Sequence, residues 1–190
     1  MKKENAFKTV GEDYSRYVRY RREIIRHSND ALGQAKRAIF SLHRNDRKAA
    51  EAAIKNAERS FKLCDARFKR MPKLKNEGSY NAAVEEYAEA LLFMQFLKTG
   101  KFGTLNRRVM GHYTYLAALS DATGEIVRYA MREATAGRYD QVDKAKQVVE
   151  EVIEFLLGLD LTGYLRQKFD QAKKNLRSLE QIMYEIKMKS

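Results

Sequence analysis

Apolar residues recur every three or four positions along most of this chain, and a single proline stands in its 190 residues. The C-terminal stretch gives the clearest case, with intervals alternating between four and three at Leu165, Phe169, Ala172, Leu176, Leu179, Met183 and Ile186. Such spacing places apolar side chains along one face of an α-helix. No strand-like alternation competes with it, so the sequence predicts an all-α fold.

Breaks in this pattern divide the chain into predicted helices. Pro72 and Gly78 bracket one turn, Ser79 is a plausible N-cap, and Gly137 and Gly158 end later helices. The predicted helices cover residues 13–43, 47–70, 80–98, 112–136, 140–157 and 162–187, and residues 99–111 form a glycine-containing loop that its basic residues could partly order.

The expected architecture is an elongated bundle of about six or seven antiparallel helices. It forms one domain over residues 1–190, in which residues 1–12 are a candidate disordered segment. A heptad seam also follows the first predicted helix, through Val18, Ile25, Leu32 and Ile39. Seams near both ends of the chain suit pairing of helices between subunits, but each could equally close within one protomer.

The net charge of +12 is unevenly distributed. Residues 16–75 contain 18 Lys and Arg against 6 Asp and Glu, whereas the rest of the chain has 19 of each. The first two predicted helices therefore carry the whole excess. A segregated basic surface attracts polyanions, and nucleic acid is the leading candidate, although a charge run can also be only a solvated helix face.

Several classes of protein are excluded. One cysteine, Cys64, rules out an intrachain disulfide and is expected to pack in the core. The start MKKENAFKTV lacks the apolar segment of a secretory signal, and the longest uncharged run, residues 109–120, is too short to span a bilayer. A cytoplasmic protein with no membrane partner is expected. A Walker motif is absent, and the histidines have no partners suited to nucleophilic catalysis.

Four carboxylates indicate possible chemistry. Glu86 and Glu89 continue an otherwise apolar stripe of one predicted helix, and Asp121 and Glu125 lie four residues apart on the next. Carboxylates on an apolar face are costly to bury unless each is paired or bound to metal. Two such pairs brought together by packing could hold divalent metal ions. Arg128 follows on the same face as Asp121 and Glu125 and could hold a phosphate.

Other interpretations of these carboxylates remain open. Interhelical salt bridges would explain them without chemistry, for example Glu125 with Arg128 or Arg132, and Glu89 with a lysine. A di-iron bundle would need Glu-x-x-His pairs, and none of His27, His43 and His112 follows a glutamate at that spacing. His43 is better read as a cap or packing residue. Oxygen ligands alone suit Mg²⁺ or Mn²⁺.

The basic surface supplies candidate contacts to an RNA backbone, which would be bound without reading its sequence. The residues chosen, besides Arg128, are Arg19, Arg22, Lys36, Arg37, Arg67, Lys69, Arg70, Lys73 and Lys75. Tyr80 and Tyr87 could stack on bases, although aromatic residues on helices more often belong to the core.

The chain resembles the translin superfamily, and within it the translin-associated factor X (Trax) branch. The likeness rests on REIIRHSNDALGQAKRAIFSLHR from residue 22, EEYAEALLFMQFLKTG from residue 85, YLAALSDATGEIVRYA from residue 115 and the ending LEQIMYEIKMKS. It covers nearly the whole chain from about residue 16. The short link after the third predicted helix, in place of a longer insert, is similar to archaeal members. Glu86, Glu89, Asp121 and Glu125 stand where that branch has acidic residues, which translin proper lacks.

This resemblance implies a metal-dependent endoribonuclease that uses Mg²⁺ or Mn²⁺, with those four carboxylates as metal ligands and catalytic residues. It implies a homo-oligomer, with an octamer favoured, that encloses single-stranded RNA or short duplexes and could take single-stranded DNA. The alternatives are a non-catalytic single-stranded RNA- or DNA-binding protein of translin type, and a structural helical oligomer.

Overall fold

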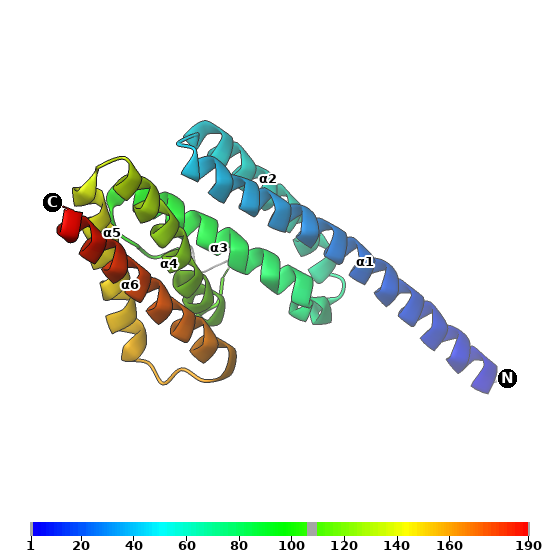
Figure 1. Ribbon diagram of the computed structural model, residues 1–190. Helices are drawn as coiled ribbons and strands as arrows, with labels where there is room; N and C mark the ends of the chain where they lie inside the picture. The colour runs from blue at the N-terminus through cyan, green and yellow to red at the C-terminus, as the bar shows by residue number, and fades with distance from the viewer. Residues whose placement is uncertain (1, 106–109, 190) are drawn as a thin grey trace.

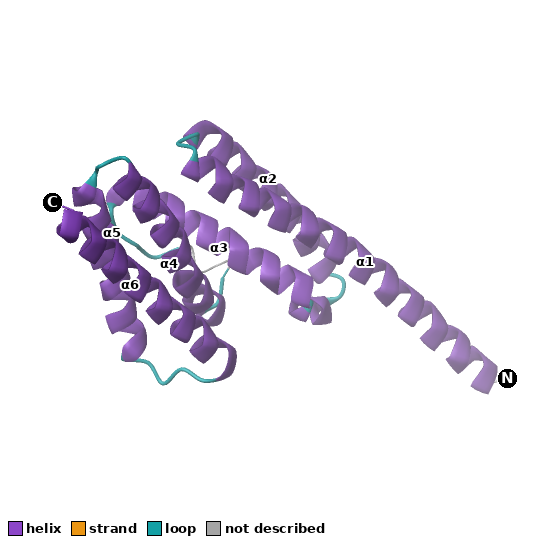
Figure 2. Ribbon diagram, in the orientation of Figure 1, coloured by secondary structure: helices purple, strands orange, loops and turns teal. Residues whose placement is uncertain are grey.

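The computed structural model describes residues 2–105 and 110–189, and these residues are helical nearly throughout (Figure 2). They form six α-helices and one 3₁₀ helix, with no strand in the described ranges, which confirms the predicted all-α bundle. The elements are α1 (Lys2–His43), α2 (Arg47–Phe68), η1 (Pro72–Asn76), α3 (Gly78–Thr99), α4 (His112–Thr135), α5 (Tyr139–Leu157) and α6 (Gly163–Lys189). Among the described helices, none combines the length and apolar character that a membrane crossing requires.

The helices form two groups that meet at α3 and α4. Helices α1 and α2 run antiparallel, and α3 packs mainly against α1 (Figure 1). Helices α4, α5 and α6 pack against one another, and α3 joins α4. The N-terminal part of α1 extends beyond the rest of the molecule (Figure 1). Because α1, α3, α4 and α6 all approach this junction, side chains from distant parts of the sequence can meet there.

The helix ends follow local chemistry in most places. Asp46 caps α2 by accepting a hydrogen bond from the Ala49 backbone N–H at 2.9 Å. Gly137, after α4, has φ +73°, a conformation that suits glycine at the end of a helix. The predicted Ser79 cap is wrong, because α3 already begins before it and Glu77 occupies the N-cap position. The Ser79 hydroxyl is buried and lacks a hydrogen-bond partner in the described part of the chain.

The predicted boundaries differ most at the N-terminus. Helix α1 begins at Lys2 rather than near residue 13, so residues 2–12 continue the helix. The predicted loop at residues 99–111 lies between α3 and α4, although residues 106–109 of it lie outside the described part. The second helix ends at Phe68, close to the predicted residue 70, and η1 fills the turn that follows.

The C-terminal seam closes within the protomer. Leu165, Phe169 and Leu179 of α6 are buried, and the remaining large residues of the seam pack against the same core. Cys64 is fully buried in a smaller apolar cluster between α1 and α2, as expected, and burial raises the pKa of its thiol. The seam of α1 is shifted from the prediction, because Ile25 and Leu32 are only half-buried.

Candidate acidic site

Helices α3 and α4 lie side by side and bring carboxylates into one cavity of about 610 Å³. We call this space the acidic cavity. Its charged and aromatic lining comes from four helices: Lys36 of α1, Glu85, Glu86 and Glu89 of α3, Tyr113 and Asp121 of α4, and Tyr164 and Lys168 of α6. The sequence prediction that these two acidic pairs share one region therefore agrees with the arrangement of the helices. Glu125 lies one helical turn beyond Asp121 and does not line the cavity itself.

Asp121 is held by a lysine from α6. The ammonium group of Lys168 contacts the Asp121 carboxylate and lies 2.8 Å from Oε1 of Glu85. Tyr164 donates a hydrogen bond to the same Glu85 oxygen at 2.6 Å. Burial alone would lower the pKa of Lys168, but hydrogen bonds to Asp121, Glu85 and Tyr164 outweigh it and raise that pKa. Lys168 is therefore a fixed cation of the cavity.

Glu125 has a different partner, His43 at the end of α1. The Nε2 atom of His43 contacts the Glu125 carboxylate, and the imidazole packs on Phe93 with ring centroids 4.6 Å apart. The Arg128 guanidinium lies 3.9 Å from the same carboxylate and is 58% exposed. His43 thus packs as expected, but it also reaches a candidate site residue.

Glu86 and Glu89 have no hydrogen bond or ion pair within the described residues. Burial, reinforced by Asp121, Glu86 and Glu125, raises the pKa of Glu89 to about 8. Burial also raises the pKa of Glu86, and Lys36 opposes that rise. The four predicted carboxylates therefore influence one another electrostatically, and Glu89 has the least compensated charge.

The cavity has the donors for a hard divalent cation but not a closed ligand set. Within residues 2–105 and 110–189, no three Asp, Glu, His or Cys side chains converge closely enough to hold one ion. The Asp121 carboxylate is already paired with Lys168, and the Glu125 carboxylate is already paired with His43. A metal would therefore need side-chain rotations that exchange these partners. The carboxylate chemistry fits Mg²⁺ or Mn²⁺. The raised pKa of Glu89 shows that its ionised form is unfavourable in the metal-free cavity, and a bound cation would favour that form.

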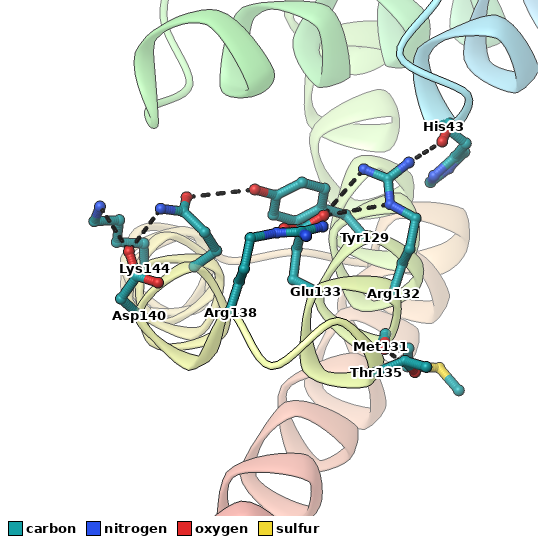
Figure 3. A network of polar contacts seen from close by, with 10 residues as sticks. His43, Tyr129, Met131, Arg132, Glu133, Thr135, Arg138, Asp140 and Lys144 are labelled. Carbon is teal, nitrogen blue, oxygen red and sulfur yellow. Dashed lines mark hydrogen bonds and ion pairs between the residues drawn. The ribbon is translucent and has the colours of Figure 1, made fainter.

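A second polar network anchors His43 from the end of α4. Arg132 donates a hydrogen bond to the backbone carbonyl of His43, and its guanidinium also contacts the buried Glu133 (Figure 3). Arg138 donates to the other oxygen of Glu133. The Arg138 hydrogen bond, assisted by Arg132, lowers the pKa of Glu133 despite burial. This network ties the last turn of α4 to the last turn of α1.

The basic residues chosen from sequence divide into two sets. Lys36 lines the acidic cavity, and Arg22, Arg37, Lys69, Lys73 and Lys75 are exposed. Arg67 instead contacts Glu23, while Arg70 donates to the Tyr20 hydroxyl at 3.3 Å and Arg19 lies 5.3 Å from the Tyr20 ring centroid. These last three have structural partners that the sequence did not indicate.

The two tyrosines suggested for base stacking are poorly placed for it. Tyr87 is buried and donates to Glu58 at 2.8 Å, and Tyr80 packs edge-on against Phe61 and Phe68. Both belong to the apolar interior, so that suggestion is corrected.

Sequence reasoning missed Glu85, Tyr164 and Lys168. The available signal was a polar stripe on α6, where Tyr164, Lys168 and Asn175 run beside the apolar seam. Asn175 continues this stripe by donating to the Thr123 hydroxyl at 2.8 Å. Nothing local in the sequence showed that this stripe faces α3 and α4.

Comparisons of the sequence and of the structure with known proteins find similar proteins. A model of the Translin family matches residues 19–190. Translin-associated protein X of Pongo abelii is 25% identical over 229 residues, which cover 97% of this chain and 78% of that protein. Among solved structures, apo-NeC3PO has a TM-score of 0.85 at 24% identity, covering 95% of this chain and 96% of the other. The AfC3PO–duplex RNA complex has a TM-score of 0.81 at 21% identity, covering 99% and 97%.

Proposed function

The chain belongs to the Translin family, as its sequence resemblance indicated, and on that premise we propose that it is a metal-dependent endoribonuclease whose reaction centre is the acidic cavity. The similar AfC3PO structure is a complex with duplex RNA, which supports RNA as the ligand here as well. The observation that carries the proposal is the state of Glu89. Its carboxyl is largely buried near three other carboxyls and makes no ion pair within the described residues.

Crowding carboxyl groups in this way lowers the stability of the folded protein. Ionised carboxylates crowded in a partly buried cavity repel one another and lose hydration. Natural sequences retain such groups mainly where charge is needed for binding or chemistry. Glu86, Glu89, Asp121 and Glu125 would hold Mg²⁺ or Mn²⁺. The bound ion would supply Lewis acidity, activating water and stabilising charge on the phosphate.

The residues around the cavity have distinct roles in this proposal. Lys168 compensates Asp121 and Glu85, and its contact with Glu85 would remain available if a cation were bound by Asp121. Lys36, which also lines the cavity, and the exposed Arg128 contact phosphates of the substrate. The exposed basic residues of α1 and α2 hold the RNA backbone by charge. We propose that the protein works as a homo-oligomer, with an octamer favoured, that encloses RNA and can also take single-stranded DNA.

Cleavage of short single-stranded RNA tests this function. The wild-type protein, Glu89→Gln and Asp121→Asn are compared in Mg²⁺, in Mn²⁺ and in chelator, with Glu154→Gln, an exposed residue of α5, as the matched control. Wild type and Glu154→Gln should cleave with metal and stop in chelator, whereas the two site variants should lose about 10²-fold or more. Equal cleavage by all four proteins would rule out the acidic cavity as the reaction centre.

A non-catalytic nucleic-acid-binding protein is the second candidate, and one observation favours it. Asp121 and Glu125 already have cationic or imidazole partners, so the carboxylates do not stand ready as a ligand set. That function predicts salt-sensitive RNA binding that survives both substitutions and no cleavage under any metal condition.

A further inference from the structure

Two tyrosines on the rim of the acidic cavity stack on each other. Tyr113 lies in the first turn of α4 and Tyr164 in the first turn of α6, and both line the cavity. Their ring centroids are 6.2 Å apart and their planes differ by 17°. Tyr113 is 49% exposed and Tyr164 is 42% exposed. Large aromatic surfaces are therefore presented to solvent beside a cluster of charged groups.

Packing does not account for this pair. Tyr80, Tyr115 and Tyr129 are partly buried against the main core, whereas neither Tyr113 nor Tyr164 is among the described residues that pack there. Polar contacts fix Tyr164 instead: its hydroxyl donates to Glu85 at 2.6 Å, and the Lys168 ammonium lies 5.0 Å from its ring centroid. Tyr164 is thus oriented by polar contacts, and Tyr113 stacks on it at the cavity rim, outside the main core.

We propose that Tyr113 and Tyr164 form a stacking subsite for an unpaired nucleobase of the RNA strand. This inference rests on the proposed function, because it takes the acidic cavity as the place where RNA is bound. A flat ring pair with an exposed face offers the surface on which any base can stack, since every base has a π-face.

The surroundings suit a nucleotide rather than an apolar ligand. Tyr164 donates directly to the Glu85 carboxylate. Lys168 contacts both Glu85 and Asp121 and so links the ring to the second carboxylate. Lys36 lines the same cavity as the two rings and is available to the phosphate of a nucleotide stacked there. Bases within a duplex are already stacked on their neighbours. The subsite therefore favours single-stranded segments or unpaired ends.

Binding in chelator tests the subsite without requiring cleavage. The probe is a short single-stranded RNA containing 2-aminopurine, whose fluorescence falls when it stacks, and a blunt duplex RNA serves for comparison. Tyr113→Ala should weaken single-strand binding about tenfold and relieve the quenching, while duplex affinity stays unchanged. Tyr113→Phe should retain both properties because it keeps the ring. Tyr139→Ala, at an exposed tyrosine outside the cavity, is the matched control.

The outcomes separate this inference from the proposed nuclease. Unchanged single-strand affinity in Tyr113→Ala, or an equal loss for single strand and duplex, would overturn the subsite, as would a wild-type protein that binds no RNA. A protein that quenches the probe through Tyr113 but never cleaves with metal would retain the subsite and refute the nuclease. Circular dichroism of each variant shows whether a loss of binding reflects unfolding, and Tyr113→Phe still decides the question if the alanine variant is unfolded.

Discussion

The ammonium group of Lys168 on α6 contacts the carboxylate of Asp121 on α4, and Glu85 on α3 lies 2.8 Å from the same nitrogen. One cation therefore joins three helices at the acidic cavity. A divalent ion that binds Asp121 must compete with this lysine. The metal-free and metal-bound proteins should consequently respond differently to loss of Lys168.

Replacing Lys168 by alanine should destabilise the metal-free protein by about 1–3 kcal/mol, because Asp121 and Glu85 then face each other without their cation. Thermal unfolding in chelator measures this loss, and Mg²⁺ should restore more stability to the variant than to wild type. Lys174→Ala, at an exposed lysine on the same helix, should change the melting temperature little in either condition. Equal melting temperatures for Lys168→Ala and Lys174→Ala would contradict this role.

The Glu89→Gln substitution should change stability and cleavage in opposite directions. It replaces a carboxyl that the folded protein must keep protonated at pH 7 while the unfolded chain ionises it, so the metal-free protein should gain about 1–3 kcal/mol at that pH. The same change should abolish metal-dependent cleavage. Urea denaturation in chelator gives the stability, and a variant that is both less stable and inactive would point to a structural role for Glu89 instead.

Stability in chelator should fall as pH rises from about 5 to 8. The pKa of Glu89 is raised to about 8 in the folded protein, so the native state retains a proton that the unfolded chain has already released. The unfolded state then binds fewer protons over this range, and the free energy of unfolding decreases with pH. Glu89→Gln should flatten this part of the curve. A difference between the two proteins that does not vary with pH would exclude Glu89 as the source.

The helices themselves could be predicted from spacing alone. Intervals of three and four residues on α6 are local, and the residues of that seam do pack against the core. Glu86 and Glu89 could also be selected from the local sequence, because they are ionisable residues in an otherwise apolar stripe of α3. Whether these groups bind metal stays a prediction.

The partners of these carboxylates could not be predicted, because they come from distant segments. Lys168 is separated from Asp121 by 47 residues, and His43 from Glu125 by 82. Only tertiary packing decides that the polar stripe of α6 and the end of α1 meet α3 and α4. The same limit explains the choice of Tyr87 for stacking: its burial depends on α2, whose Glu58 accepts its hydrogen bond.

Substitution of an exposed basic residue should affect RNA binding, whereas substitution of an ion-paired one should affect stability. Arg37 is exposed, so Arg37→Ala should weaken RNA binding and reduce the slope of log affinity against log salt by about 1. Arg67 contacts Glu23, so Arg67→Ala should act first through stability. Binding isotherms at several salt concentrations, paired with melting curves, separate the two effects. An unchanged salt slope in Arg37→Ala would remove that residue from the RNA-binding surface.

The network around Glu133 supports the end of α4 and should be sensitive to a single substitution. The Glu133 side chain is 5% exposed and accepts hydrogen bonds from Arg132 and Arg138, which also lower its pKa. Glu133→Gln should cost about 2–3 kcal/mol, because it leaves two guanidinium groups without their shared anion. For a chain of this length that corresponds to a fall in melting temperature of about 4–12 °C.

The matched control for that network is Glu180→Gln, at an exposed glutamate of α6, which should melt within about 1 °C of wild type. Because Arg132 also holds the backbone carbonyl of His43, the loss of its anion should loosen the contact between His43 and Glu125. The His43 ring resonances in NMR spectra should therefore shift in Glu133→Gln and stay in place in Glu180→Gln. If the ring resonances of His43 are the same in both variants, the network stabilises α4 without positioning His43.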